Sequence, residues 1–190
     1  MSDKPGKPKI KAENILVAEF EYIAGTAFQA NEDRARVSTF YLVSVGSLFG
    51  AFFGTQGETS PSAYTAFAGL FLFLSVFGAL TLLQLIRLRQ AWFQSAKAMN
   101  KMKEFVIAQD KDRYLEKAFL WTPKSLPRPY KTGSVAFFLA LQVAMLSAIT
   151  LGAAIYYAGL ALNYLLPLGA AIGGAFYLFI QLYIYRSLLK

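Results

Sequence analysis

The stretch that decides the fold is Thr132–Tyr185, which reads TGSVAFFLALQVAMLSAITLGAAIYYAGLALNYLLPLGAAIGGAFYLFIQLYIY. Its 54 residues contain no Asp, Glu, Lys or Arg. A helix needs about 20 mainly apolar residues to cross a bilayer core of about 30 Å. The stretch therefore predicts two crossings joined by a short turn. Two further uncharged runs, Val37–Gly57 and Thr59–Ile86, each have the length of one crossing.

These runs predict an all-α integral membrane protein with four transmembrane helices. We place the crossings near Val37–Phe53, Ala63–Ile86, Ser134–Tyr157 and Leu160–Tyr185. Only helices or closed barrels satisfy every backbone polar group inside lipid. The runs do not alternate strictly between apolar and polar residues, which argues against a barrel. A soluble helical bundle is disfavoured because runs of this length exceed what a water-soluble core uses.

Composition excludes several kinds of chemistry. Of the 190 residues, 56% are apolar and 16% are charged, against about 45–50% and 25% in soluble domains. The chain has no Cys and no His, so it lacks thiolate ligands, disulfides and the usual near-neutral general base. The predicted crossings carry no ionisable Asp, Glu, Lys or Arg, which disfavours coupled ion transport. We expect no enzymatic activity, no metal site and no cofactor.

The positions of the basic residues predict the orientation. Residues 87–131 hold eleven basic and four acidic residues, whereas the short connection at 158–163 holds no charge. Because Lys and Arg collect on the cytoplasmic side, both termini and the 87–131 connection are predicted to be cytoplasmic. The same rule accounts for the net charge of +8, so nucleic acid is not an expected partner.

The chain divides into five predicted segments. They are a disordered basic tail at 1–11, a cytoplasmic amphipathic helix at 12–36, a transmembrane hairpin at 37–86, a basic cytoplasmic helical connection at 87–131 and a second transmembrane hairpin at 132–190. The 12–36 helix carries one apolar stripe at spacings of three and four, made by Leu16, Phe20, Ile23, Ala27 and Ala30. This helix either continues into the first crossing or bends at Asn31–Arg36.

The second crossing has no helix breaker after it. An apolar pattern continues through Leu88, Trp92, Ala96, Met99, Met102 and Phe105 or Val106, which predicts one helix from Ala63 to about Ala108. We expect its last part to pack against the 12–36 helix as a cytoplasmic stalk. The alternative is a basic amphipathic helix lying flat on anionic lipid. The predicted cytoplasmic basic surface comprises Arg87, Arg89, Lys97, Lys101 and Lys103.

Small residues recur every four positions on three of the predicted crossings. The three strips are Gly46, Gly50 and Gly54; Ala140, Ala144, Ala148 and Gly152; and Gly169 and Gly173. Such strips let helix backbones approach closely, which is a main source of association in lipid. The strips could pack the helices of one chain or join several copies. Because three crossings carry one, we expect a symmetric homo-oligomer.

Gln142 lies about a third of the way into the third predicted crossing. Serine and threonine side chains can hydrogen-bond to their own helix backbone, whereas a glutamine inside hydrocarbon needs another partner. We expect Gln142 to face a neighbouring helix, as a structural contact, or a wet lumen, as a pore-lining residue.

Two functional hypotheses follow. The first is a non-enzymatic, homo-oligomeric membrane scaffold or conditional pore, whose cytoplasmic helices receive a signal or a protein partner. The alternative is an accessory structural subunit of a larger membrane complex. A facilitator for a small solute has less support, because the crossings are so apolar.

Overall fold

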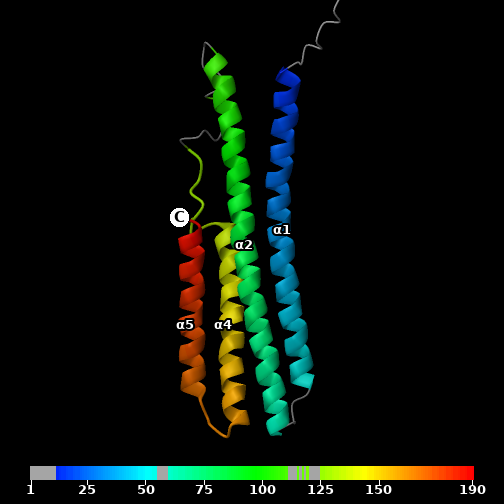
Figure 1. Cartoon of the computed structure of the whole chain (residues 1–190), viewed down its shortest axis with the longest axis vertical. Coiled ribbons are helices and arrows are strands. Elements are labelled where there is room, and N and C mark those ends of the chain that lie inside the picture. The colour runs from blue at the N-terminus through cyan, green and yellow to red at the C-terminus, as the bar shows by residue number, and fades with distance from the viewer. Residues whose placement is uncertain (1–11, 55–59, 111–114, 116, 118, 120–124) are drawn as a thin grey trace, which may run out of the picture. The chain divides into compact units, whose positions relative to one another are not determined.

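The computed structural model describes residues 12–54, 60–110, 115, 117, 119 and 125–190. Four long helices make up nearly all of this part of the chain (Figure 1). They are α1 (Ala12–Gly54), α2 (Pro61–Gln109), α4 (Val135–Ala161) and α5 (Pro167–Leu188). Each is long and apolar enough to cross a membrane, with a mean hydropathy of 1.5–2.3 over its most apolar window. The architecture is that of a multi-pass membrane protein. The tail predicted at 1–11 lies outside the described residues.

The described residues form two compact units. Unit 1 comprises the described residues within 12–29 and 92–126, and unit 2 comprises those within 30–91 and 127–190. Both α1 and α2 are unbroken helices, of 43 and 49 residues, that contribute to each unit. The helix assignment of α1 continues through Asn31–Arg36, and the choice between a straight continuation and a bend there stays a prediction.

In unit 1, the apolar stripes of α1 and α2 face each other. Leu16 and Phe20 of α1 line one groove together with Met102 and Val106 of α2. Val106 therefore continues the α2 stripe, whereas the alternative residue, Phe105, is 59% exposed. The two helices therefore contact each other within unit 1, and their role as a cytoplasmic stalk stays a prediction.

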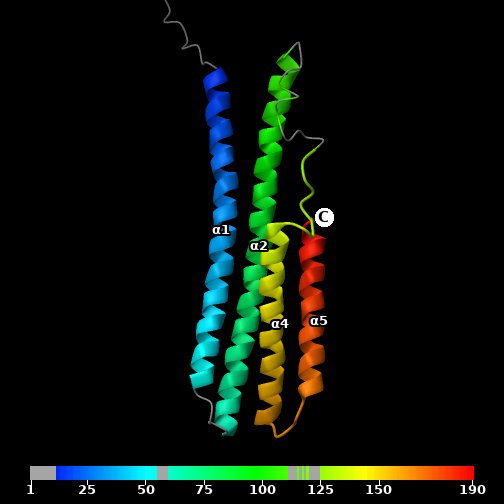
Figure 2. The ribbon, with the colours of Figure 1, turned by 180° about the vertical axis from the view of Figure 1, so that it is seen from behind.

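In unit 2, α4 and α5 run side by side and are joined at the end opposite the C-terminus, as views from both sides show (Figures 1 and 2). The outward face of α5 carries large hydrophobic side chains that are each 60–73% exposed, namely Leu168, Ile172, Phe176, Phe179 and Tyr183. Its inward face carries small or polar residues, namely Ala170, Gly174, Gln181 and Tyr185. A helix in water has the opposite arrangement. The distribution fits a protein whose outer surface meets hydrocarbon.

Aromatic rings fill unit 2 where α1 ends and α2 begins. Phe52 lies 4.8 Å from Phe67 and 5.4 Å from Phe71, measured between ring centroids. Tyr157 of α4 stacks on Phe71 at 5.6 Å and meets Phe67 at 5.5 Å. Each such pair contributes about 0.5–1.5 kcal/mol beyond simple area burial. The cluster joins three helices within unit 2.

The turn between α4 and α5 corrects the predicted boundaries, because the last crossing begins at Pro167 and not at Leu160. Asn163 has a positive φ of 61°, which asparagine tolerates better than most residues. The amide of Tyr164 donates to the carbonyl of Gly159 at 2.8 Å, and that of Asn163 to Leu160 at 3.0 Å. These two bonds form a Schellman motif. The motif ends α4, and Pro167 then starts α5 without losing a hydrogen bond.

A glycine at the centre of unit 2 gives a direct test of this packing. A Cβ at Gly78 would lie 2.4 Å from the Tyr41 hydroxyl oxygen and 2.6 Å from the Ser147 Cβ. We predict that Gly78→Ala lowers the free energy of unfolding by about 1–3 kcal/mol through overpacking. Thermal unfolding in mild detergent measures the loss.

The matched control is Gly69→Ala on the same helix. Among the described residues, no heavy atom lies within 4 Å of a Cβ built at Gly69. This variant should be as stable as the parent, or more stable by up to about 1 kcal/mol, because alanine favours helix over glycine. Equal stability of the Gly78 and Gly69 variants would contradict the described packing.

Candidate functional site

All four helices of unit 2 meet at a buried polar cluster. The Ser147 hydroxyl donates to the Ser75 carbonyl at 2.8 Å, and the Gln181 amide nitrogen donates to the Ser147 Oγ at 3.0 Å. The Tyr41 hydroxyl donates to the Leu74 carbonyl at 3.3 Å. These side chains are 3% exposed or less. The cluster therefore links α1, α2, α4 and α5 through hydrogen bonds away from water.

The hydrogen-bond directions in this cluster follow from the chemistry of each group. Ser147 has one hydroxyl proton, which goes to the Ser75 carbonyl, so its oxygen accepts from Gln181. This assignment fixes the orientation of the Gln181 side-chain amide, with its nitrogen toward Ser147. The Oε1 of Gln181 is then buried and has no hydrogen-bond partner among the described residues. The absence of a side chain at Gly78 leaves space for Ser147, because a Cβ at position 78 would clash with the Ser147 side chain.

The groups in the cluster are hydroxyls, an amide and backbone carbonyls, and none of them is charged at neutral pH. Interhelical bonds of this kind contribute about 0.6–2 kcal/mol each in lipid. The arrangement is suited to holding four helices in register.

The buried glutamine is Gln181, not the one singled out from the sequence. Gln142 lies on the exposed side of α4, because the buried face of this helix runs through Ala140, Val143 and Ser147. No helix within the described part of the chain covers Gln142. The expectation that Gln142 faces a neighbouring helix or a lumen stays a prediction. Such a helix or lumen would have to involve a second protein chain.

The small-residue strips of α4 and α5 pack within the chain. Ala140, Ala144 and Ala148 are buried. A Cβ at Gly152 would lie 3.1 Å from the Ala170 carbonyl oxygen. On α5 the buried strip is Ala170 and Gly174, whereas Gly169 is exposed and Gly173 meets the Ile155 side chain. These contacts bring the two backbones close together.

The strip on α1 is different. Gly46, Gly50 and Gly54 are all exposed, and no described heavy atom lies within 4 Å of a Cβ built at any of them. The strip therefore has no packing role among the described residues.

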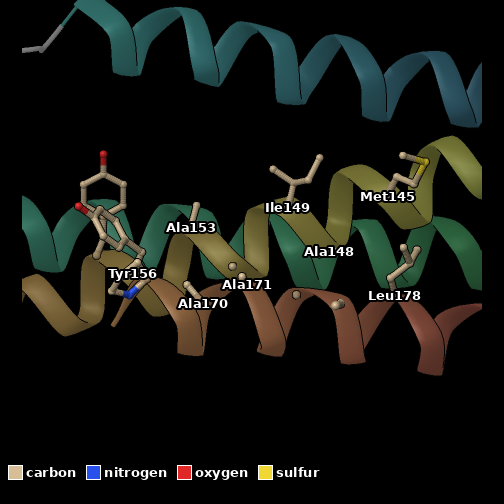
Figure 3. Close-up of a pocket in the computed structure, with 13 residues that line it drawn as sticks. Met145, Ala148, Ile149, Ala153, Tyr156, Ala170, Ala171 and Leu178 are labelled. Atoms are coloured by element: carbon tan, nitrogen blue, oxygen red, sulfur yellow. The ribbon is translucent and has the colours of Figure 1, made fainter. Parts of the chain in front are cut away.

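A shallow apolar groove of about 530 Å³ follows the outer side of α4 and α5. Tyr156 lies at one end of it and Met145 and Leu178 at the other (Figure 3). Small residues, among them Ala153 and Ala171, keep the groove open between these ends.

Of the residues in the predicted basic surface, Arg89 is buried, with 7% of its surface exposed. Its Nε donates to the Pro129 carbonyl at 3.1 Å, inside unit 2. Arg87 is exposed in unit 2, and Lys97 and Lys101 are exposed in unit 1. The Lys103 Nζ lies 5.2 Å from the centre of the Phe119 ring, as in a cation–π contact.

Comparison with protein-family models, with curated proteins and with solved structures finds no match to this chain. The residues themselves therefore carry the functional argument.

Ser147 is the residue on which the polar cluster depends. We predict that Ser147→Ala lowers the free energy of unfolding in detergent by about 0.6–2 kcal/mol, because it leaves the Gln181 amide without its acceptor. Ser44→Ala is the control, since the Ser44 hydroxyl donates to the Phe40 carbonyl of its own helix at 2.8 Å. A Ser147 variant no less stable than the Ser44 variant would show that the cluster does not hold the helices together.

Proposed function

We propose that the protein is a non-enzymatic membrane scaffold or conditional pore, built from several copies of this chain. In this proposal both termini and the 87–131 connection are cytoplasmic, and the cytoplasmic helices receive a signal or a protein partner. The excess of basic residues in 87–131 supports this orientation.

The observation that carries the proposal is the open strip of Gly46, Gly50 and Gly54 on α1. Each glycine inside a helix costs about 1 kcal/mol of helix stability relative to alanine. Three of them on one exposed face, without a packing partner in the described residues, are explained if a second copy lies against them. A strip of this kind is self-complementary, so two copies can meet across a two-fold axis.

The interior of unit 2 is filled with side chains, which argues against a pore through a single protomer. The centre of unit 2 is a packed hydrophobic core whose residues include four with no exposed surface, namely Tyr41, Leu74, Val143 and Ala144. A conducting path would therefore run between protomers, and the outward-facing Gln142 is the candidate to line it. A scaffold needs no such path.

The groove along α4 and α5 favours the second candidate function, an accessory subunit of a larger complex. It is apolar, open on its outer side and lined by small residues at its middle, which suits a transmembrane helix of another protein.

Substitution within the open strip tests self-association. We expect the parent protein to be larger than one protomer in mild detergent and Gly50→Leu to be smaller, with an unchanged unfolding temperature. Size-exclusion chromatography with light scattering gives both masses. Gly69→Leu is the control, because Gly69 is also exposed but lies on α2 outside the strip. A monomeric parent, or a Gly50→Leu protein of parental mass, would refute the proposed assembly.

Reconstituted liposomes separate pore from scaffold. In the pore form of the proposal, the parent releases a small trapped dye, and Gln142→Leu slows that release by removing a polar lining group. Liposomes that stay sealed in the presence of any tested partner would reject the pore and leave the scaffold or the accessory subunit.

A further inference from the structure

Two arginines from different helices of unit 2 act on each other electrostatically. Arg34 of α1 and Arg89 of α2 are near enough for their charges to act on each other, and Tyr185 of α5 lies beside both. Arg89 and Tyr185 are buried, and Arg34 is partly buried. Arg89 is tied by its bond to the Pro129 carbonyl.

The hydrogen-bonding capacity of Arg34 is only partly used. One terminal nitrogen donates to the Asn31 side-chain oxygen. Its Nε and its other terminal nitrogen are buried and have no partner among the described residues. A buried donor without an acceptor costs about 1–3 kcal/mol, and more when it is charged. The guanidinium thus keeps two donor groups without an acceptor among the described residues, and hydrogen bonds from arginine to oxyanions are among the strong ones in proteins.

The surrounding charge increases the demand for an anion. Burial lowers the pKa of Arg34, and the nearby charge of Arg89 lowers it further. The described part of unit 2 holds eight basic residues and two acidic ones, Glu32 and Asp33. Asp33 lies 3.8 Å from Arg36.

A third guanidinium contacts the aromatic residues of this region. The Arg186 Cζ lies 5.8 Å from the centre of the Tyr130 ring, and that ring lies 6.2 Å from the ring of Tyr185.

We propose that Arg34 and Arg89 bind a phosphoryl group, and that its source is the headgroup of an anionic membrane phospholipid. The free terminal nitrogen of Arg34 can donate to a phosphoryl oxygen, and Arg89 supplies the second positive charge. Arg34 stands three residues before Val37 and Arg89 three residues after Ile86, so both lie at the ends of predicted crossings, where headgroups are found. Phosphate dissolved in water has the same chemistry and is the competing source.

The test compares Arg34→Gln with Arg36→Gln, which removes the same charge from an exposed position of the same helix. Each protein is placed in nanodiscs of phosphatidylcholine alone, of phosphatidylcholine with phosphatidylglycerol, or of phosphatidylcholine with inorganic phosphate in the buffer. We expect phosphatidylglycerol to raise the unfolding temperature of the parent and of Arg36→Gln by about 2–4 °C. Arg34→Gln should show no such rise.

The sign of the effect in neutral lipid separates binding from a purely structural role. In phosphatidylcholine, which carries no net charge, Arg34→Gln removes like-charge repulsion with Arg89, so we expect it to unfold at the same temperature as the parent or higher. A rise with phosphatidylglycerol that is equal in all three proteins would overturn the site. A rise with inorganic phosphate alone, lost in Arg34→Gln, would overturn the lipid source and support phosphate binding from water.

Native mass spectrometry gives a measurement that does not depend on unfolding. Arg34→Gln should bind phosphatidylglycerol about tenfold more weakly than the parent, the effect of losing one charge-assisted contact. Arg34→Lys keeps the charge but loses the fixed directions of the guanidinium donors, so its affinity should fall between the two. Equal affinity of all variants would contradict the proposal.

Discussion

Hydrocarbon gives helices no hydrophobic reason to associate, because lipid tails are as apolar as leucine. Whatever holds unit 2 together must come from close contact between backbones and from hydrogen bonds between helices. The structure supplies both. Gly174 lets α5 approach α4 so closely that a Cβ there would lie 2.9 Å from the Ala148 carbonyl oxygen. Ser147, in the same region of α4, joins Ser75 and Gln181 of two other helices.

The apolar surroundings also explain which residues lie on the outer surface. Large apolar residues such as Phe176 and Phe179 face outward on α5, where lipid tails solvate them. Small or polar groups that do not face the interior, such as Gly50 and Gln142, then require another explanation. Self-association is the explanation we propose for the glycine strip on α1. For Arg34, which lies at the end of a predicted crossing and has buried donors without an acceptor among the described residues, we propose a bound phosphoryl group.

The sequence predicted the number and approximate positions of the long apolar helices, because a helix that spans lipid requires a long run without charged residues. It could not predict which way each helix faces. Gln142 and Gln181 have the same chemistry, and only the rotation of α4 and α5 makes one exposed and the other buried. The inward position of Arg89 likewise depends on Pro129, 40 residues away. The late start of α5 had a local signal, since Asn163 and Pro167 together mark a helix stop and a helix start.

The central claim is that hydrocarbon covers the outward face of unit 2, and cysteine labelling tests it most directly. The chain has no cysteine, so a single Phe176→Cys or Lys190→Cys introduces the only thiol. Residue 176 is 64% exposed in the isolated chain, and residue 190 is the exposed C-terminal position. In unsealed membrane fragments without detergent, a water-soluble maleimide should label position 190 and leave position 176 unlabelled until detergent is added. Equal labelling rates at the two positions before detergent would contradict the account.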